Sequence, residues 1–194
     1  MSLLLTAHPD DECMFFTPIL HQVTHIYCLS NGNNDGLGAI REKEFINSCD
    51  TLQVNGSIGP LQDGKIWETA DILKLVKIYL KRNNISKVYT FDNYGVSGHT
   101  NHISLYKALM SSDISFYSLQ SVPIYRKYIG LYDLFFTLLL LPFSKRALKL
   151  ASPVQVVKGY YSMMQHKSQM VWFRYLYILF SRFMWINEFI FNEK

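Results

Sequence analysis

Residues 2–12, SLLLTAHPDDE, join an apolar run to a histidine, a proline and three consecutive acids. The run at 2–7 predicts a short buried strand, and the acids begin a helix expected at 11–22, which Pro18 would shorten or kink. Dense carboxylates repel one another, so they lie in solvated turns or hold a positive ligand. Acids at a helix start also favour the helix dipole and cap free amides, so this stretch alone leaves both interpretations open.

The residues that follow alternate between strand and helix patterns. We expect strands at 23–30, 87–92 and 114–120, helices at 39–54, 69–83 and 102–110, and a turn-rich connection at 59–64. Strands that alternate with helices predict a mostly parallel sheet with helices on both faces. The predicted fold class is therefore α/β, a Rossmann-like three-layer sandwich.

Composition bounds the number of domains and the classes of partner. The chain has 194 residues, 49% of them hydrophobic and 15% aromatic, which excludes a disordered protein. A formal net charge of +4 is too weakly basic for a dedicated nucleic-acid binder and would tolerate anionic lipid. Three cysteines without a C-x-x-C pair argue against a disulfide scaffold and favour a reducing compartment.

We expect one domain over residues 1–194. Residues 1–125 would form the α/β core, and residues 126–194 an aromatic-rich, helical C-terminal lobe with breaks at Pro142 and Pro153.

Side chains suited to chemistry gather in three loops that a parallel sheet would bring to one edge. The loops are 8–12, with His8 and the acids Asp10, Asp11 and Glu12; 30–38, SNGNNDGLG; and 92–102, with Asp92, His99 and His102. Two histidines and one carboxylate form a common catalytic zinc set with a position left for water. A divalent cation would also offset the repulsion between the acids. Taken alone, His99 would be a surface-loop histidine, the class in which we place three further histidines, His21, His25 and His166.

The motifs AHPDDE at 7–12 and GVSGHTNH at 95–102 resemble those of the zinc-dependent N-acetylglucosaminyl-phosphatidylinositol de-N-acetylases. This is the PIG-L type within the LmbE-like superfamily of sugar deacetylases. The likeness covers nearly the whole chain and includes GNNDGLGAIREKE at 32–44. The segment HKSQMVWFR at 166–174 points to the glycolipid branch.

The resemblance implies a role for each site residue. Three residues would ligate Zn²⁺, or another divalent metal such as iron, cobalt or manganese: His8, Asp11 and His102. Asp10 would be the general base. His99, charged by a neighbouring carboxylate, would stabilise the oxyanion or protonate the leaving amine. Asp92 is a candidate for that carboxylate, although capping of the strand end is equally open to it. Many bacterial relatives carry an acid where this chain has Asn101, whose amide would orient the ring of His99.

The implied reaction is hydrolysis of the N-acetyl group of N-acetylglucosaminyl-phosphatidylinositol, the second step of GPI-anchor biosynthesis. Two alternatives stay open: a deacetylase of another N-acetylglucosamine conjugate, and a non-catalytic subunit of a membrane complex. The family implies the cytoplasmic face of the endoplasmic reticulum membrane. Eukaryotic members usually carry an N-terminal anchor that is absent here, so it was removed, or the sequence is a shortened form, or the aromatic end docks instead. The oligomeric state stays open.

Arg41 follows a glycine-rich loop at a helix start, where backbone amides accept anions. It is the candidate for binding a phosphate or a sugar hydroxyl of the substrate. The alternative is an ion pair with Glu44, one turn further along the same helix.

Residues 170–191 combine many aromatic side chains with two arginines and a glutamate. These charges argue against a membrane-spanning helix. The pattern suits a helix at a membrane interface or one packed on the sheet. The apolar run at 134–143 is too short to span a bilayer and could join the same membrane-interface surface.

Overall fold

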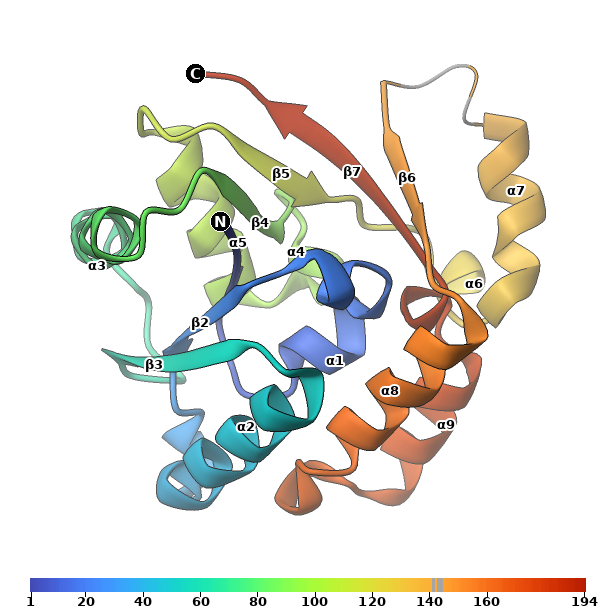
Figure 1. The fold of residues 1–194 in the computed structure, drawn as a ribbon, viewed down its shortest axis with the longest axis horizontal. Coiled ribbons are helices and arrows are strands. Elements are labelled where there is room, and N and C mark those ends of the chain that lie inside the picture. The colour runs from blue at the N-terminus through green and yellow to red at the C-terminus, as the bar shows by residue number, and fades with distance from the viewer. Residues whose placement is uncertain (141, 143–144) are drawn as a thin grey trace.

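The computed structural model describes residues 1–140, 142 and 145–194, and within them seven strands form one sheet (Figure 1). The sheet order is β3-β2-β1-β4-β5-β7-β6. The strands are β1 (Ser2–Thr6), β2 (His25–Ser30), β3 (Asn55–Leu61), β4 (Lys87–Phe91), β5 (Phe116–Leu119), β6 (Ala147–Leu150) and β7 (Ile186–Asn192). Strands β1 to β5 pair in parallel, whereas β7 is antiparallel to both β5 and β6. The predicted α/β fold with a mostly parallel sheet is confirmed.

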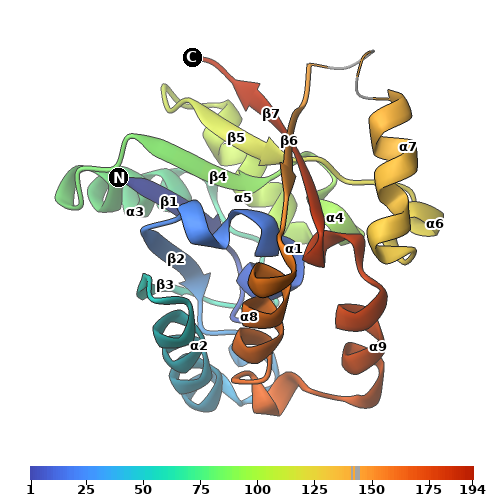
Figure 2. The ribbon, with the colours of Figure 1, turned by 45° about the vertical axis from the view of Figure 1, so that its right-hand side comes forward.

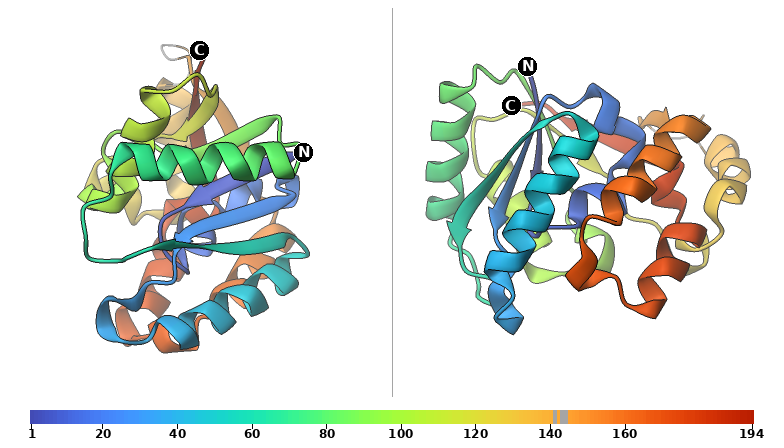
Figure 3. Two further views of the ribbon diagram at one scale, coloured as in Figure 1. Left: turned by 90° about the vertical axis from the view of Figure 1, so that its left-hand side faces the viewer. Right: turned by 60° about the horizontal axis from the view of Figure 1, so that its bottom comes forward.

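Helices cover both faces of this sheet. In Figure 3 the strands lie between α3 and α2. Helices α3 (Thr69–Arg82) and α5 (Thr100–Met110) pack together on one face, and α1 (Asp11–Phe15), α2 (Gly38–Leu52) and α8 (Pro153–Met163) pack on the other. The smaller helices are α4 (Gly95–Gly98), α6 (Ile124–Lys127), α7 (Asp133–Leu140), α9 (Trp172–Phe180), and the 3₁₀ turns η1 (Thr17–Gln22), η2 (Asn33–Asp35), η3 (Gly130–Tyr132), η5 (Lys167–Gln169) and η6 (Arg182–Met184).

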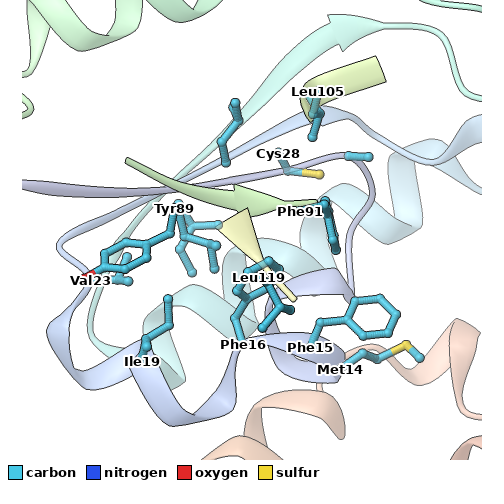
Figure 4. Close-up of a cluster of buried hydrophobic side chains, with 14 of the residues drawn as sticks. Met14, Phe15, Phe16, Ile19, Val23, Cys28, Tyr89, Phe91, Leu105 and Leu119 are labelled. Carbon is cyan, nitrogen blue, oxygen red and sulfur yellow. The ribbon is translucent and has the colours of Figure 1, made fainter. Parts of the chain in front are cut away.

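The central strand β1 explains the apolar run that opens the chain. It pairs with β2 on one side and β4 on the other, and its residues are buried on both faces. A strand covered on both sides is apolar throughout instead of alternating. After it, the predicted helix at 11–22 divides into α1 and η1, with Pro18 at the start of η1. Phe15, the last residue of α1, and Phe16, which follows it, both pack against Phe91 of β4 (Figure 4).

The prediction of a turn over 59–64 was wrong for its first half, because β3 extends to Leu61. This strand contains two glycines and a proline, residues with low β-strand propensity, so its sequence does not predict a strand. A Cβ at Gly56 would lie 2.5 Å from the Cys49 sulfur, and one at Gly59 would lie 2.8 Å from a backbone oxygen of β2. Proline is tolerated here because β3 is an edge strand. The glycines therefore allow close packing that local sequence does not reveal.

The C-terminal segment contains the predicted helices, and also β6 and β7, which extend the sheet of the core. Pro153 starts α8, where Ser152 and Gln155 form a capping box. Helix α7 ends at Leu140. The apolar run at 134–143 includes positions 141 and 143, which lie outside the described residues. Both neighbours of Pro142, where a break is predicted, therefore also lie outside them. Across the described ranges, no helix has both the length and the apolar character needed to cross a bilayer.

The strand order reverses between β1 and β4, and this reversal positions the site. From β1 the chain continues outward to β2 and β3, and then returns to β4 on the other side of β1. Loops that follow strands on either side of such a switch point diverge and leave a crevice at the carboxyl edge. The loops at 7–10 and 92–99 border this crevice.

Candidate active site

A cavity of about 370 Å³ lies at the switch point between β1 and β4. Its walls include all six residues that the sequence predicts for the site: His8, Asp10, Asp11, Arg41, His99 and His102. Segments more than ninety positions apart in the chain thus converge, as the loop argument predicts.

His102 is held so that one ring nitrogen points at an acid. Its ring stacks on the ring of Phe91, with 3.9 Å between the two ring centroids. Its Nδ1 lies 3.0 Å from the carbonyl oxygen of Gly95. Because a carbonyl only accepts, Nδ1 carries the hydrogen, and the neutral ring offers a lone pair at Nε2. This buried Nε2 lies 3.2 Å from Oδ1 of Asp11 and has no hydrogen-bond partner among the described residues. Two electron-pair donors at this distance repel one another unless a cation or a proton lies between them.

His8 completes the cluster. Its Nε2 lies 3.0 Å from Oδ1 of Asp63, which leaves Nδ1 directed toward Asp11 Oδ2 at 3.7 Å. One ring nitrogen from each of His8, His99 and His102 lies within 4.8 Å of the other two. Two imidazole nitrogens and a carboxylate oxygen are the donor set that a catalytic zinc uses. The residues present therefore fit the metal that the sequence predicts.

The charges around Asp11 favour its ionised form. Burial alone would raise the pKa of this carboxyl, but the neighbouring His102 and His8 outweigh burial and lower it. Burial also disfavours a charged His8, yet the hydrogen bond that His8 donates to Asp63 and the charge of Asp11 raise the pKa of that imidazole. The cluster is thus arranged to hold positive charge beside Asp11.

Asp10 is the second acid in the cavity. Burial raises the pKa of its carboxyl, whereas the nearby Arg174 and Arg41 oppose that rise. Its Oδ2 lies 3.3 Å from Nη2 of Arg174 and 3.8 Å from Nη2 of Arg41. A carboxylate with a raised pKa accepts a proton more readily at neutral pH, which suits a general base.

Comparison with known proteins agrees with this geometry. The family model described as PIG-L, GlcNAc-PI de-N-acetylase, matches residues 3–112, which include all six predicted site residues. The chain belongs to this family. A "Probable N-acetylglucosaminyl-phosphatidylinositol de-N-acetylase" of Dictyostelium discoideum is 35% identical over 237 residues, covering 97% of this chain and 92% of the relative. The N-acetylglucosaminyl-phosphatidylinositol de-N-acetylase of Bos taurus is 37% identical over 210 residues, covering 96% and 81%.

A deacetylase of the teicoplanin biosynthetic pathway has a similar fold. The two structures superpose with a TM-score of 0.71 at 13% sequence identity, over 100% of this chain and 99% of that one. The likeness extends through the strands and helices of residues 126–194. The recognition made from the two histidine motifs is thus confirmed at the level of family and fold.

In this PIG-L chain, the third acid of the first motif supports Asp10 from beneath the cavity. Glu12 Oε2 accepts a hydrogen bond from the backbone N–H of Asp10 at 3.1 Å. Glu12 Oε1 lies 2.7 Å from His166 Nε2 and accepts from the Ser48 hydroxyl at 2.7 Å. Asp10 has φ of 103°, a strained value for a residue with a Cβ. The Glu12 contact helps to hold this backbone and thus the direction of the Asp10 carboxylate.

The assignment of His166 to the surface was wrong, because its side chain is fully buried. Its partner Glu12 is 154 positions away, so no local pattern could reveal the pair. Cys13 lies close enough to both for a shared metal ion. However, the carboxylate and imidazole are already hydrogen-bonded, and burial raises the pKa of the Cys13 thiol well above its usual value. A protonated thiol is a poor ligand, so this cluster is a hydrogen-bond network.

Arg41 braces the backbone around the cavity. Its Nη1 donates to the carbonyl of Gly32 at 3.1 Å, and its Nη2 donates to the carbonyl of Pro9 at 2.7 Å. Glu44, its alternative partner, instead accepts from the backbone N–H and the hydroxyl of Ser168, each at 2.7 Å. Arg41 therefore ties the loop before α2 to the loop that carries His8 and Asp10.

Asp92 takes the capping role. Its carboxylate accepts hydrogen bonds from the backbone N–H of Tyr94, Gly95 and Ser121, and from the Ser121 hydroxyl at 2.7 Å. It holds the turn that contains Gly95, whose carbonyl in turn orients His102. The contact of Asp92 with the site is thus indirect.

His99 differs from the expected charged imidazole. Burial and the neighbouring His8 and His102 lower the pKa of its ring. Its Nδ1 accepts from the backbone N–H of Asn101 at 3.3 Å, so in the neutral ring the hydrogen is on Nε2. The side-chain amide of Asn101 lies 3.3 Å from His8 Nε2 and not against His99. A neutral His99 can still donate one hydrogen bond into the cavity.

Among the cavity residues that the sequence analysis missed, three are charged: Asp63, Lys127 and Arg174. Asp63 follows the unrecognised strand β3; with that strand assigned, the loop rule would have placed it at this edge. Lys127 donates to the carbonyl of Val96 at 2.8 Å, and burial lowers the pKa of its ammonium. Arg174 lies within an aromatic segment, where its charge indicated only that the segment does not span a membrane.

Proposed function

We propose that this chain hydrolyses the N-acetyl group of N-acetylglucosaminyl-phosphatidylinositol, producing acetate and glucosaminyl-phosphatidylinositol. The observation that carries the proposal is the 3.2 Å approach of His102 Nε2 to Asp11 Oδ1 beside the buried acid Asp10. Relatives that share more than a third of the aligned residues are named for this activity. We assign the proposed reaction to the second step of GPI-anchor biosynthesis. We assign the protein to the cytoplasmic face of the endoplasmic reticulum membrane.

Three side chains would hold a Zn²⁺ ion, or another divalent metal: His8, Asp11 and His102. Zinc bound there would supply Lewis acidity and lower the pKa of water toward about 7. The hydrogen bonds from His8 to Asp63 and from His102 to Gly95 leave one lone pair of each ring directed inward.

The proton transfers fall to Asp10 and His99. Asp10 takes a proton from the attacking water, and its raised pKa makes it a better acceptor. The Nε2–H of His99 donates a hydrogen bond to the oxygen on which negative charge develops. When the C–N bond breaks, Asp10 returns its proton to the leaving amine. This scheme needs His99 neutral, in agreement with the direction in which its surroundings shift its pKa.

Arg41 lines the same cavity and is our candidate for contact with a sugar hydroxyl or the phosphate. Because its Nη atoms also hold two backbone carbonyls, we expect substitution of Arg41 to disturb the loop as well as substrate binding.

The test combines metal analysis with a deacetylation assay on N-acetylglucosaminyl-phosphatidylinositol. Asp10→Asn is expected to keep the wild-type metal content and lose about 10²–10⁴-fold in kcat. His102→Ala is expected to lose both metal and turnover. Wild-type turnover in Asp10→Asn would reject Asp10 as the base. Equal activity on water-soluble N-acetylglucosamine conjugates would favour another substrate, and a folded, metal-loaded but inactive wild type would favour a non-catalytic subunit.

A further inference from the structure

Helix α7 has the reverse of the usual polarity. Its two polar residues, Asp133 and Thr137, are fully buried. Its large apolar residues face outward, with Phe135 70% exposed and Leu139 60% exposed. A helix on a protein surface in water normally buries its apolar stripe. The outward face of α7 therefore suits an apolar medium.

A buried ion-pair network fixes this orientation. Asp133 pairs with Arg126 Nε at 2.6 Å and with Arg182 Nε at 2.8 Å, and Arg182 also reaches Glu188 Oε2 at 3.0 Å. The hydroxyl of Thr137 accepts from both arginines. Turning α7 to bury its phenylalanines would withdraw Asp133 from the buried Arg126 and Arg182, leaving both arginines to share Glu188, at a cost of several kcal/mol. The exposure of the apolar side is thus built into the fold.

Helix α9 repeats the pattern on the same side of the molecule (Figures 1 and 2). Trp172 is 75% exposed and Leu179 57% exposed, and in α9 only Tyr177 and Ile178 are buried. Segment 124–132, which directly precedes α7, adds further exposed aromatic side chains, including Tyr132 at 85%. We call the outward residues of α7, α9 and segment 124–132 the apolar face. On ordinary soluble proteins, exposed hydrophobic residues are scattered singly, whereas here they form one broad surface.

The apolar face is continuous with the candidate active site. A second hollow, about 390 Å³, lies along α9. Tyr128, Phe173 and Tyr177 line both this hollow and the cavity that holds His8 and Asp10. A lipid whose chains lie against α9 could therefore place its headgroup at the cavity.

Charge is distributed unevenly between the two parts of the chain. Residues 126–194 carry ten Lys and Arg against three Asp and Glu, a formal net charge of +7. Residues 1–125 carry nine against twelve, a formal net charge of −3. The part that bears the apolar face is thus the basic one. Anionic lipid headgroups attract such a surface by about 1 kcal/mol for each basic residue near the membrane.

We propose that the apolar face docks on the surface of an anionic lipid bilayer, with α7 and α9 lying in the interfacial layer and the active-site cavity opening beside it. Aromatic and leucine side chains enter the boundary between headgroups and acyl chains, and the net positive charge of residues 126–194 attracts the anionic headgroups. Docking depends on the exposed apolar side chains and the positive charge, so it does not require the deacetylation to take place.

The test is sedimentation of the full chain with vesicles of phosphatidylcholine, alone or mixed with phosphatidylinositol. We expect binding to the mixed vesicles and weaker binding at high salt. The double variant Leu139→Glu/Leu179→Glu should bind about tenfold more weakly or worse, because each charge would enter an apolar layer. Ile78→Glu is the matched control: it lies on α3, on the opposite side of the molecule, and is 58% exposed.

A separate activity measurement on a water-soluble N-acetylglucosamine conjugate shows whether the double variant remains folded and active, since neither leucine lines the cavity. Failure of the wild type to bind mixed vesicles would overturn the proposal, as would equal binding of the wild type and the double variant. A dimer of the wild type that the double variant abolishes, without vesicle binding, would show that a second copy covers this face and would also overturn it.

Discussion

Two clusters of buried charge differ in the kind of cation that faces each acid. Beneath α7, Asp133 and Glu188 pair with arginines, which stay charged at all ordinary pH values. In the cavity, Asp11 faces His8 and His102, imidazoles that are ordinarily neutral near pH 7. The first cluster is balanced by the chain itself. The second has lone pairs left to share with an added cation, and this distinguishes structural charge from charge kept for a ligand.

The sharpest way to break this comparison is to remove one partner beneath α7. Arg182→Leu leaves Asp133 and Glu188 in the interior with fewer partners, and we expect a loss of about 3–5 kcal/mol in the free energy of unfolding. Urea denaturation measures it. The control is Lys77→Met, which breaks the exposed Lys77–Asp113 pair and should change the free energy of unfolding far less, because solvent screens that pair. Similar losses in the two variants would refute a structural role for the network.

Gly95→Ala tests the geometry of the second cluster. A Cβ at Gly95 would lie 2.5 Å from the Cβ of His102, so the imidazole must shift. We expect metal affinity to fall by about 10–100-fold, as when the outer partner of a ligand is disturbed. Gly98→Ala is the control, because Gly98 shares the positive φ but its added Cβ would meet nothing closer than 3.8 Å. Titration with Zn²⁺ measures the metal affinity of both variants. Equal affinities of Gly95→Ala and Gly98→Ala would show that Gly95 does not position His102 for the metal.

The smallest expected effect concerns the support beneath Asp10. His166→Ala removes one of the partners of Glu12, and we expect about a tenfold fall in kcat with little change in KM or metal content. His166→Gln places an amide nitrogen near the position of Nε2 and should recover part of the loss. A variant that only unfolds more easily, with normal kcat when folded, would show that His166 stabilises the fold without positioning Asp10.

Local patterns predicted the elements whose residues repeat a clear period. The continuous apolar run of β1 and the helical spacing of α3 were both predicted within two residues. Strand β3 was missed because its two glycines allow close contacts with α2 and β2, and its proline is tolerated only at the edge of the sheet. Strand β7 was missed because aromatic residues suit a helix and a strand alike, and only pairing with β5 decides between them.

The sequence by itself determined the family, the parallel α/β core and the six residues that meet in the cavity, because the three segments that carry them follow strands whose carboxyl ends share one edge. Tertiary structure alone decided which atoms face each other: Glu12 against His166, Asp63 against His8, and the arginine pairs that turn the phenylalanines of α7 outward. These contacts join residues far apart in the chain. Their energies depend on burial and distance, which no local pattern of residues specifies.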